Sequence, residues 1–182
     1  MQWKDQWQKW QQEGHPLPFL LIDAAGFEGG WDEVPQQPWQ MAESLFLGDL
    51  AEELRDVAPY LVQAKDWGEE TLAVVQDLVR RQLALVLTLP PVPKDDGAGQ
   101  EPMSFAQLHR HLRRFSVAYG QAGKPLYFRF YDARLLPEVV EFMQPDQRAD
   151  FMRPLSVVVG SDVEDVCYAW MAGNPNEVVC PA

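Results

Sequence analysis

The stretch from Leu126 to Arg134 most constrains the fold of this chain, because it combines an aromatic, strand-like run with three charged side chains. If residues 127–131 form a strand, alternate side chains point to opposite faces, so at least one charge lies close to a packed surface. A charge in that position needs a partner. We therefore expect Arg129, Asp132 and Arg134 to pair with one another as structural residues.

The same run resembles the FRFYDPR-like signature of the type VI secretion effector chaperones, which are also called Tap-type adaptors. Ala133 stands where many members have proline, which removes a pre-set backbone angle but leaves both arginines and the aspartate in place. Four further segments match the family in the same order along the chain: residues 19–25, 44–46, 58–62 and 111–115. The chain is similar to a short member that stops before the variable, largely helical C-terminal lobe of many members.

This resemblance implies a non-enzymatic adaptor without a cofactor. The implied partners are a secreted effector protein, the VgrG spike protein onto which the effector is loaded, and, as an open alternative, a second adaptor subunit that replaces the missing lobe. Two other classes also stay open. One is an immunity-like or accessory protein that binds a toxin without delivering it. The other is a small metal-dependent hydrolase or nuclease that uses Asp23, Arg129 and Asp132, although a carboxylate such as Asp23 at the end of a strand more often caps the following turn.

The overall composition is that of a folded protein with one core. The chain has 182 residues and 47% hydrophobic content, and its formal net charge of −12 opposes nucleic-acid binding, which draws on a basic surface. No apolar run approaches the roughly 18 residues of a membrane span, and the first residues lack the apolar core of a secretory signal. We expect one cytoplasmic domain, with an amphipathic helix at 1–14, the family core at 15–143 and a short extension with a hairpin at 144–182.

Apolar periodicity predicts an α/β fold, with a mixed β-sheet, flanking helices and a C-terminal β-hairpin. Nearly continuous apolar runs at 17–24 and 83–89 predict buried strands, and residues 155–159 and 166–170 predict the hairpin. The expected helices span residues 69–80, 105–115, 135–143 and 146–152. Ser104 and Gln107 have the spacing of a capping box, which places the start of the second of these helices.

Five tryptophans are candidate anchors for a partner protein. Trp3, Trp7 and Trp10 recur at helical spacing and form one stripe, which either packs on the body of the domain or docks a partner. Trp31 and Trp39 lie in a predicted glycine- and proline-containing surface loop. Tryptophan is enriched at binding hot spots, so each of the five either packs within the domain or binds a partner.

Three arginines are candidate polar contacts at the rim of such an interface. Arg110, Arg113 and Arg114 lie on the polar face of the helix at 105–115. In so acidic a chain they either contact an acidic partner or are solvated and locally paired.

Few other residues combine into a metal or catalytic site. His109 and His111 are two residues apart, so on a helix they point to nearly opposite sides and do not share a metal ion. The acidic clusters lack the spacing of a calcium loop. Cys167 and Cys180 have no CxxC spacing and are expected to be structural or incidental thiols. We therefore expect neither a metal site nor catalytic residues.

Overall fold

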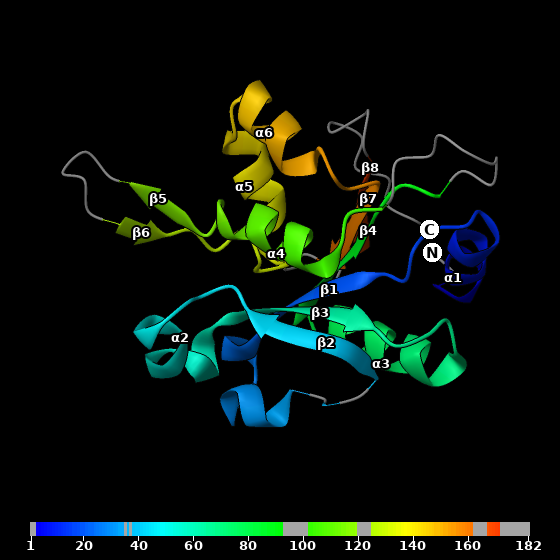
Figure 1. Ribbon diagram of the computed structural model, residues 1–182, viewed down its shortest axis with the longest axis horizontal. Coiled ribbons are helices and arrows are strands. Elements are labelled where there is room, and N and C mark those ends of the chain that lie inside the picture. Colours follow the sequence, from blue (N-terminus) through cyan, green and yellow to red (C-terminus); the bar gives the residue numbers. More distant parts are fainter. Residues whose placement is uncertain are drawn as a thin grey trace.

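The computed structural model describes residues 3–34, 36, 38–92, 102–119, 125–161 and 167–171. Its centre is a six-stranded sheet with the order β2-β3-β1-β4-β7-β8 (Figure 1). These strands are β1 (Phe19–Asp23), β2 (Trp39–Ser44), β3 (Pro59–Ala64), β4 (Ala84–Thr88), β7 (Val157–Ser161) and β8 (Cys167–Met171). The expected α/β class and the terminal hairpin, formed by β7 and β8, are confirmed. A mixed sheet was expected, but each strand pair in the described ranges is antiparallel.

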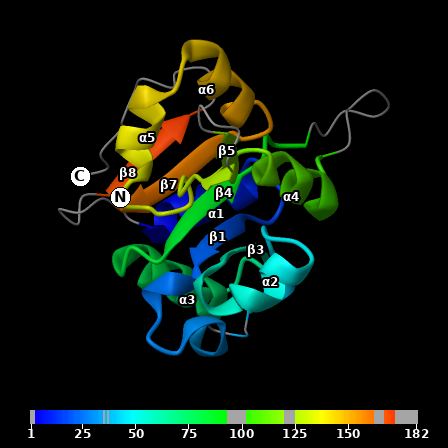
Figure 2. The ribbon, with the colours of Figure 1, turned by 90° about the vertical axis from the view of Figure 1, so that its left-hand side faces the viewer.

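The central strands are buried on both faces, which explains why they read as continuous apolar runs. All five residues of β1 are buried. Phe19 and Leu21 belong to one core cluster, and Leu20 and Ile22 belong to another. Alternate residues of a strand point to opposite sides, so the sheet separates two cores, each covered by its own helices. Figure 2 shows α3 and α4 on opposite sides of the central strands.

The first face is covered by α1 (Trp3–Gln12) and α3 (Glu69–Arg80). Trp7 and Trp10 from α1 are each 2% exposed and join the core on this side. The indole Nε1 of Trp7 donates a hydrogen bond to the Trp67 carbonyl oxygen at 2.9 Å, and the two rings meet edge to face. Four short helices also lie on this side of the sheet: η1 (Ala24–Gly26), η2 (Gly30–Glu33), α2 (Asp49–Glu53) and η3 (Arg55–Val57).

The second face is covered by α4 (Phe105–Arg113), α5 (Leu136–Phe142) and α6 (Pro145–Met152). The predicted capping box is present, because Ser104 Oγ accepts from Gln107 N and Gln107 Oε1 accepts from Ser104 N. The four helices predicted from periodicity are therefore all found, with ends that shift by one or two residues. A separate two-stranded sheet, β5 (Val117–Tyr119) with β6 (Pro125–Tyr127), projects beside this layer (Figure 1).

The predicted strand at 127–131 is wrong in extent, because β6 ends at Tyr127. The Phe128 amide still donates to the Ser116 carbonyl oxygen at 3.0 Å. The chain then turns, since the Asp132 amide donates to the Arg129 carbonyl oxygen at 3.2 Å and the Leu135 amide donates to the Asp132 carbonyl oxygen at 3.0 Å. The charged residues of this stretch therefore occupy a turn that leads into α5.

Two strands of the main sheet, β2 and β3, were missed by the sequence patterns. β3 begins at Pro59, and a proline inside an apolar run does not suggest a strand. Proline is tolerated at the first residue of a strand, where it need not donate to the ladder. β2 is an edge strand with four consecutive exposed residues, so it lacks the apolar alternation of a half-buried strand. Val166 and Cys180, which figured in the sequence predictions, lie outside the described residues.

Candidate functional site

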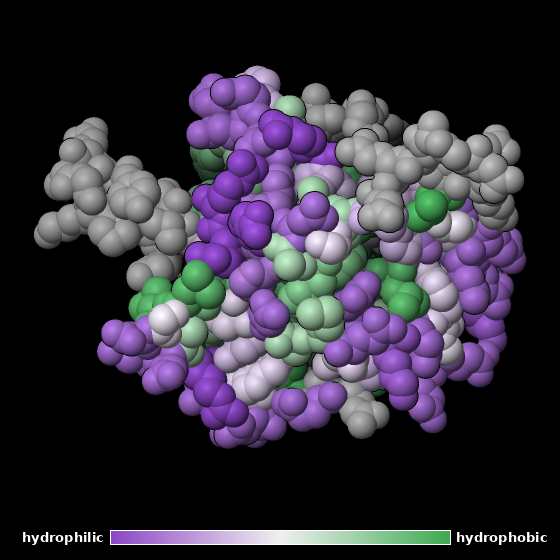
Figure 3. Space-filling model, viewed as in Figure 1, coloured by the Kyte–Doolittle hydropathy of each residue, from purple (hydrophilic) through white to green (hydrophobic). Residues whose placement is uncertain are grey.

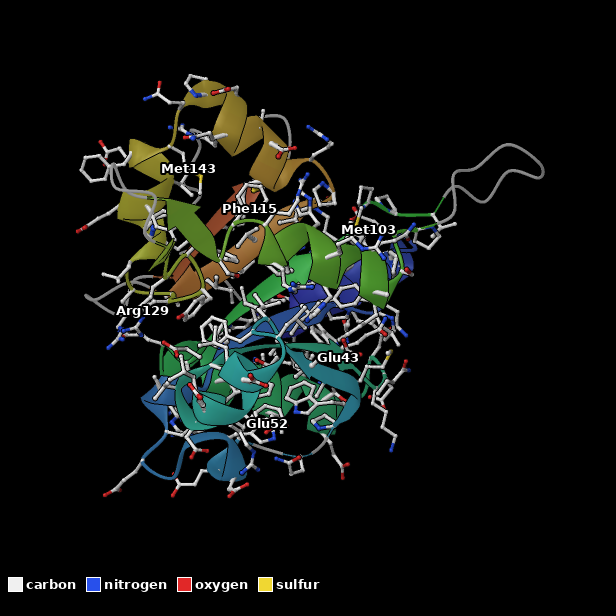
Figure 4. The ribbon with its side chains drawn as sticks, turned by 60° about the vertical axis from the view of Figure 1, so that its left-hand side comes forward. Glu43, Glu52, Met103, Phe115, Arg129 and Met143 are labelled. Carbon is white, nitrogen blue, oxygen red and sulfur yellow. The ribbon has the colours of Figure 1, made fainter. Side chains whose placement is uncertain are left out.

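The four signature residues Asp23, Arg129, Asp132 and Arg134 come together as one ionic group, which we call the signature cluster. Asp23 ends β1, and the other three lie in the turn between β6 and α5. Arg129 Nη2 lies 2.6 Å from Asp23 Oδ2 and 3.2 Å from Asp132 Oδ2. The predicted pairing is confirmed, and it extends to a fourth residue 106 positions away from Arg129. Figure 4 labels Arg129 at the lower end of the second-face layer.

Asp132 is the centre of the signature cluster. Its carboxylate accepts from Arg134 Nε at 2.9 Å and from Arg134 Nη2 at 2.8 Å, which is a bidentate pair. Oδ1 also accepts from the Arg134 backbone amide at 3.1 Å, so the aspartate closes the turn locally. The Asp132 side chain is 2% exposed, whereas those of Arg129 and Arg134 are 43% and 44% exposed. The carboxylate is thus buried beneath two guanidinium groups that still reach solvent.

Asp23 has two roles in the same place. Its Oδ1 accepts from the Ala25 amide at 3.1 Å and caps η1, so the expected turn cap is confirmed. Its other oxygen, Oδ2, binds Arg129. The side chain is 5% exposed. Asp23 therefore ties the end of the central strand β1 to the turn that follows β6.

The pKa values of the two buried carboxylates, Asp23 and Asp132, are shifted in opposite directions. Burial is the largest influence on both and by itself raises the pKa of each. At Asp132, hydrogen bonds and charge from Arg134, with the charge of Arg129, outweigh burial and hold the pKa below its ordinary value. At Asp23, Arg129 and the Ala25 amide offset only part of the burial, so the pKa stays raised. Burial, with Asp23 nearby, also raises the pKa of Tyr131 to about 12.

The tryptophan stripe faces inward. Trp7 and Trp10 are buried in the first-face core, which favours packing on the domain and corrects their assignment as exposed anchors. Trp3, Trp31 and Trp39 are half-buried and pack against the same core. Trp31 stacks on Tyr60 with 3.6 Å between the ring centroids. A partner-binding role for these three stays a prediction, but each already has contacts within the chain.

The large apolar side chains that do reach the surface were missed by the sequence patterns. Among the described residues they are Met41, Leu47, Val57, Val92, Leu135 and Phe142. Phe142 is 83% exposed. A signal was present in α5, because Leu136 and Val140 already fill its buried face, so Leu135 and Phe142 are surplus to the apolar positions that one face needs.

The three arginines in α4 and at its C-cap have different surroundings. Arg110 is exposed and Arg113 is half-buried. Arg114 is paired, because its Nη2 lies 3.1 Å from Asp150 Oδ2 in α6, and its guanidinium also lies over the Phe115 ring. His109 and His111 do diverge as expected: the ring nitrogen Nε2 of His109 is 2.7 Å from the Ser44 carbonyl oxygen, and that of His111 is 3.0 Å from the Phe151 carbonyl oxygen.

Arg110 and Arg114 line an open groove of about 730 Å³, which we call the arginine groove. Pro90, Pro91 and Met103 belong to the apolar part of the lining, and Arg153 joins Arg110 and Arg114 in its basic part. Arg113 is not among the lining residues. Sequence reasoning missed Arg153, because it comes from the turn after α6 and has no pattern that links it to α4.

None of the helices in the described ranges has the length and apolar character needed to cross a bilayer. Within the same ranges, no group of three or more His, Cys, Asp or Glu side chains is arranged to hold a metal ion.

Comparison with known proteins identifies the family. No curated protein and no solved structure matched the chain. Residues 19–150 match one family, and this span includes all four residues of the signature cluster and α4. The match covers more than two thirds of the 182 residues. The chain therefore belongs to the family described as "Domain of unknown function (DUF4123)", a domain that is commonly found in type VI secretion effector chaperones and adaptors.

Proposed function

We propose that this protein is a cytoplasmic type VI secretion adaptor that binds an effector and helps to load it onto the VgrG spike. The observation that carries this proposal is the family match over residues 19–150, within which the whole signature segment lies. The signature cluster fits a structural role in such an adaptor, because it ties β1 to the turn before α5 through four ion-paired side chains.

The exposed apolar side chains are consistent with a protein that binds other proteins. An adaptor needs apolar anchors with a polar rim, in an interface weak enough to be released on delivery. Leu135 at the N-cap of α5 and Phe142 at its last position are exposed, and Glu138 and Glu141 are exposed between them. These side chains give α5 the composition of a small anchor surface.

The hydrolase or nuclease alternative receives less support. It needs a carboxylate that reaches a metal ion or a substrate. Asp23 and Asp132 do lie close to Arg129, but their side chains are 5% and 2% exposed and each already accepts from an arginine. We propose a binding protein without catalytic residues.

The test is an affinity pull-down of tagged protein from the native cytoplasm, followed by mass spectrometry of the bound chains. We expect to recover an effector and VgrG. Phe142→Ser should reduce recovery of one of them, whereas the matched variant Glu141→Ser on the same helix should not, because it removes no apolar anchor.

Three results would count against the adaptor. Recovery of an effector but never of VgrG would favour the immunity-like or accessory protein. Recovery of neither, from cells confirmed to express both, would overturn a binding role. Metal-dependent hydrolysis that Asp23→Ala abolishes would favour the enzyme.

A further inference from the structure

The arginine groove is assembled from three parts of the chain that lie far apart in sequence. Leu89 to Val92 follow β4, Pro102 and Met103 precede α4, and Arg153 and Pro154 follow α6. Figure 4 labels Met103 beside α4, near the segment that leaves β4. These parts enclose a volume of about 730 Å³. Ligand sites commonly measure roughly 300–1,000 Å³, so the groove is large enough to hold a ligand.

One carboxylate serves two arginines at the edge of the groove. Asp150 Oδ2 lies 3.1 Å from Arg114 Nη2, and Asp150 Oδ1 lies 2.5 Å from Arg153 Nη2. The side chains of Arg114 and Arg153 remain 54% and 73% exposed. A guanidinium carries five N–H donors, so both arginines keep donors for an incoming group.

The groove therefore carries a local positive charge. Arg110 is exposed and has no ion pair among the residues that the structure describes. With Arg114 and Arg153 against the single carboxylate of Asp150, these side chains carry three positive charges and one negative charge, which is an excess of two. The chain as a whole has a net charge of −12. Figure 3 shows strongly hydrophilic surface over α6 and the neighbouring part of α4.

His111 holds Arg114 in position at the base of the groove. Its Nδ1 lies 3.2 Å from Arg114 Nη2, and an arginine nitrogen only donates, so Nδ1 accepts and Nε2 carries the hydrogen that it donates to the Phe151 carbonyl oxygen. This is the neutral form of the imidazole. Burial, with the charges of Arg114 and Arg153 adding to it, lowers the pKa of His111 and keeps that form.

Part of the groove's lining is apolar. Pro90, Pro91, Pro102 and Met103 supply it, and Val92, which also lines the groove, is 39% exposed. Proline rings have no backbone N–H to satisfy, and Met adapts its shape to apolar side chains that pack on it. A ligand that suits this lining combines carboxylates with apolar groups.

A nucleic acid fits this surface less well than a peptide. Its phosphates extend over a long basic track, and beyond the groove they would meet the acidic surface of this chain. A short peptide places its charges only on the arginines. Within the groove the attraction is local, since salt screens charges beyond about 8 Å.

We propose that the arginine groove binds a short, extended, acidic segment of a partner protein, with carboxylates on Arg110, Arg114 and Arg153 and apolar side chains against Pro90, Pro91 and Met103. The identification of this partner as the effector or the spike rests on the proposed function. The acidic and apolar chemistry of the segment rests only on the residues that line the groove.

An array of 12-residue peptides that combine Asp or Glu with Leu, Val and Pro tests this directly, with a matched array in which Lys replaces each acidic residue. The wild-type protein binds the acidic array in preference to the Lys array, and binding weakens as salt rises. Arg110→Glu/Arg153→Glu lowers the affinity for the best acidic peptides at least tenfold. Both side chains are exposed, so this variant keeps its fold, which circular dichroism and a thermal melt verify.

The matched control is Lys4→Glu/Arg80→Glu, which also reverses two positive charges. Lys4 on α1 and Arg80 on α3 are 61% and 79% exposed and lie on the other side of the sheet, so their reversal changes the net charge equally without touching the groove. This variant binds the acidic peptides within about twofold of wild type. Equal losses in both variants would show that only net charge matters and would overturn the groove, as would an acidic array that binds no better than the Lys array. If single-stranded RNA binds more tightly than the acidic peptides, and the same double variant loses this binding, the ligand of the groove is a nucleic acid and the peptide proposal is overturned.

The native pull-down separates this inference from the proposed function. If effector and VgrG are recovered equally with wild type and with Arg110→Glu/Arg153→Glu, the adaptor function is supported and the groove is excluded as the binding site of either partner. If acidic peptides need the groove but neither protein is recovered, peptide binding by the groove is supported and the adaptor function is contradicted.

Discussion

The two faces of the sheet bury cores from alternate residues of the same strands, yet they present very different chemistry. Under α1 and α3 the core is closed by indole rings, among them Trp7 and Trp10. Under α4, α5 and α6 the core is bordered by ion pairs, by two buried histidines and by the arginine groove. Both sides leave apolar side chains exposed, such as Val57 in η3 and Phe142 in α5. The second side adds a groove lined by arginines and prolines, which gives it the mixed charged and apolar character of a binding surface.

The largest effect expected is on the first face. Trp7→Ala removes a side chain that is 2% exposed, together with its hydrogen bond to the Trp67 carbonyl oxygen. We expect it to lower the free energy of unfolding by about 3–5 kcal/mol, as large-to-small changes in cores do. Trp3→Ala is the matched control, because Trp3 is half-buried on the same helix and should cost less. Urea unfolding measures the free energy of unfolding of both variants. Equal losses would contradict the deeper burial of Trp7.

On the second face, Asp132→Ala breaks the centre of the signature cluster. It leaves Arg129 and Arg134 without their shared buried carboxylate, and we expect a loss of roughly 3 kcal/mol. Asp150→Ala also removes a carboxylate shared by two arginines, but its side chain is 32% exposed, so the loss should stay below about 1 kcal/mol. Unchanged thermal stability in Asp132→Ala would show that the signature cluster contributes little to folding and would reopen a direct binding role for it.

The two buried carboxylates of the signature cluster should respond oppositely to pH. The pKa of Asp132 is lowered on folding, so its stabilisation is complete above the ordinary value of 3.8 and is lost as the pH falls through the folded pKa. The advantage of wild type over Asp132→Asn should therefore shrink in acid. The pKa of Asp23 is raised on folding, so its buried charge costs stability as the pH rises above 3.8 through the folded pKa. Wild type should lose stability relative to Asp23→Asn over that rise.

Urea unfolding of wild type and both Asn variants, from neutral pH down to about 2, measures these differences. Parallel curves for the three proteins would contradict both shifts. Trends of the same sign for the two variants would contradict the different balance of burial and arginine contacts at the two sites.

The smallest effect expected concerns the charge balance of the groove. Asp150→Asn removes the carboxylate that competes for Arg114 and Arg153. We expect acidic peptides to bind about threefold tighter, a change of the size that exposed ion pairs contribute. Fluorescence anisotropy measures this, with Asp146→Asn as a control, since Asp146 is exposed on the same helix and does not line the groove. Weaker binding in Asp150→Asn would mean that Asp150 positions the arginines more than it competes for them.

Local chemistry made much of the fold predictable. The helix at 69–80 was found with the predicted bounds, because its apolar spacing and its acidic start are properties of neighbouring residues. The capping box at Ser104 and Gln107 is likewise a contact between residues three apart. The edge strand β2 was missed because its exposed residues carry no pattern of burial, and its position depends on pairing with β3.

The sequence by itself determined the helices at 69–80, 105–113, 136–142 and 145–152, the buried strands β1 and β4, and the signature residues that needed charged partners. Only the tertiary structure decided which partner each charge found. Asp23 meets Arg129 across 106 positions, and Arg114 meets Asp150 from another helix. It also decided that Trp7 and Trp10 lie inside while Phe142 lies outside. The physical reason is that helical periodicity and capping act between near neighbours, whereas burial and ion pairing depend on which distant elements the fold brings together.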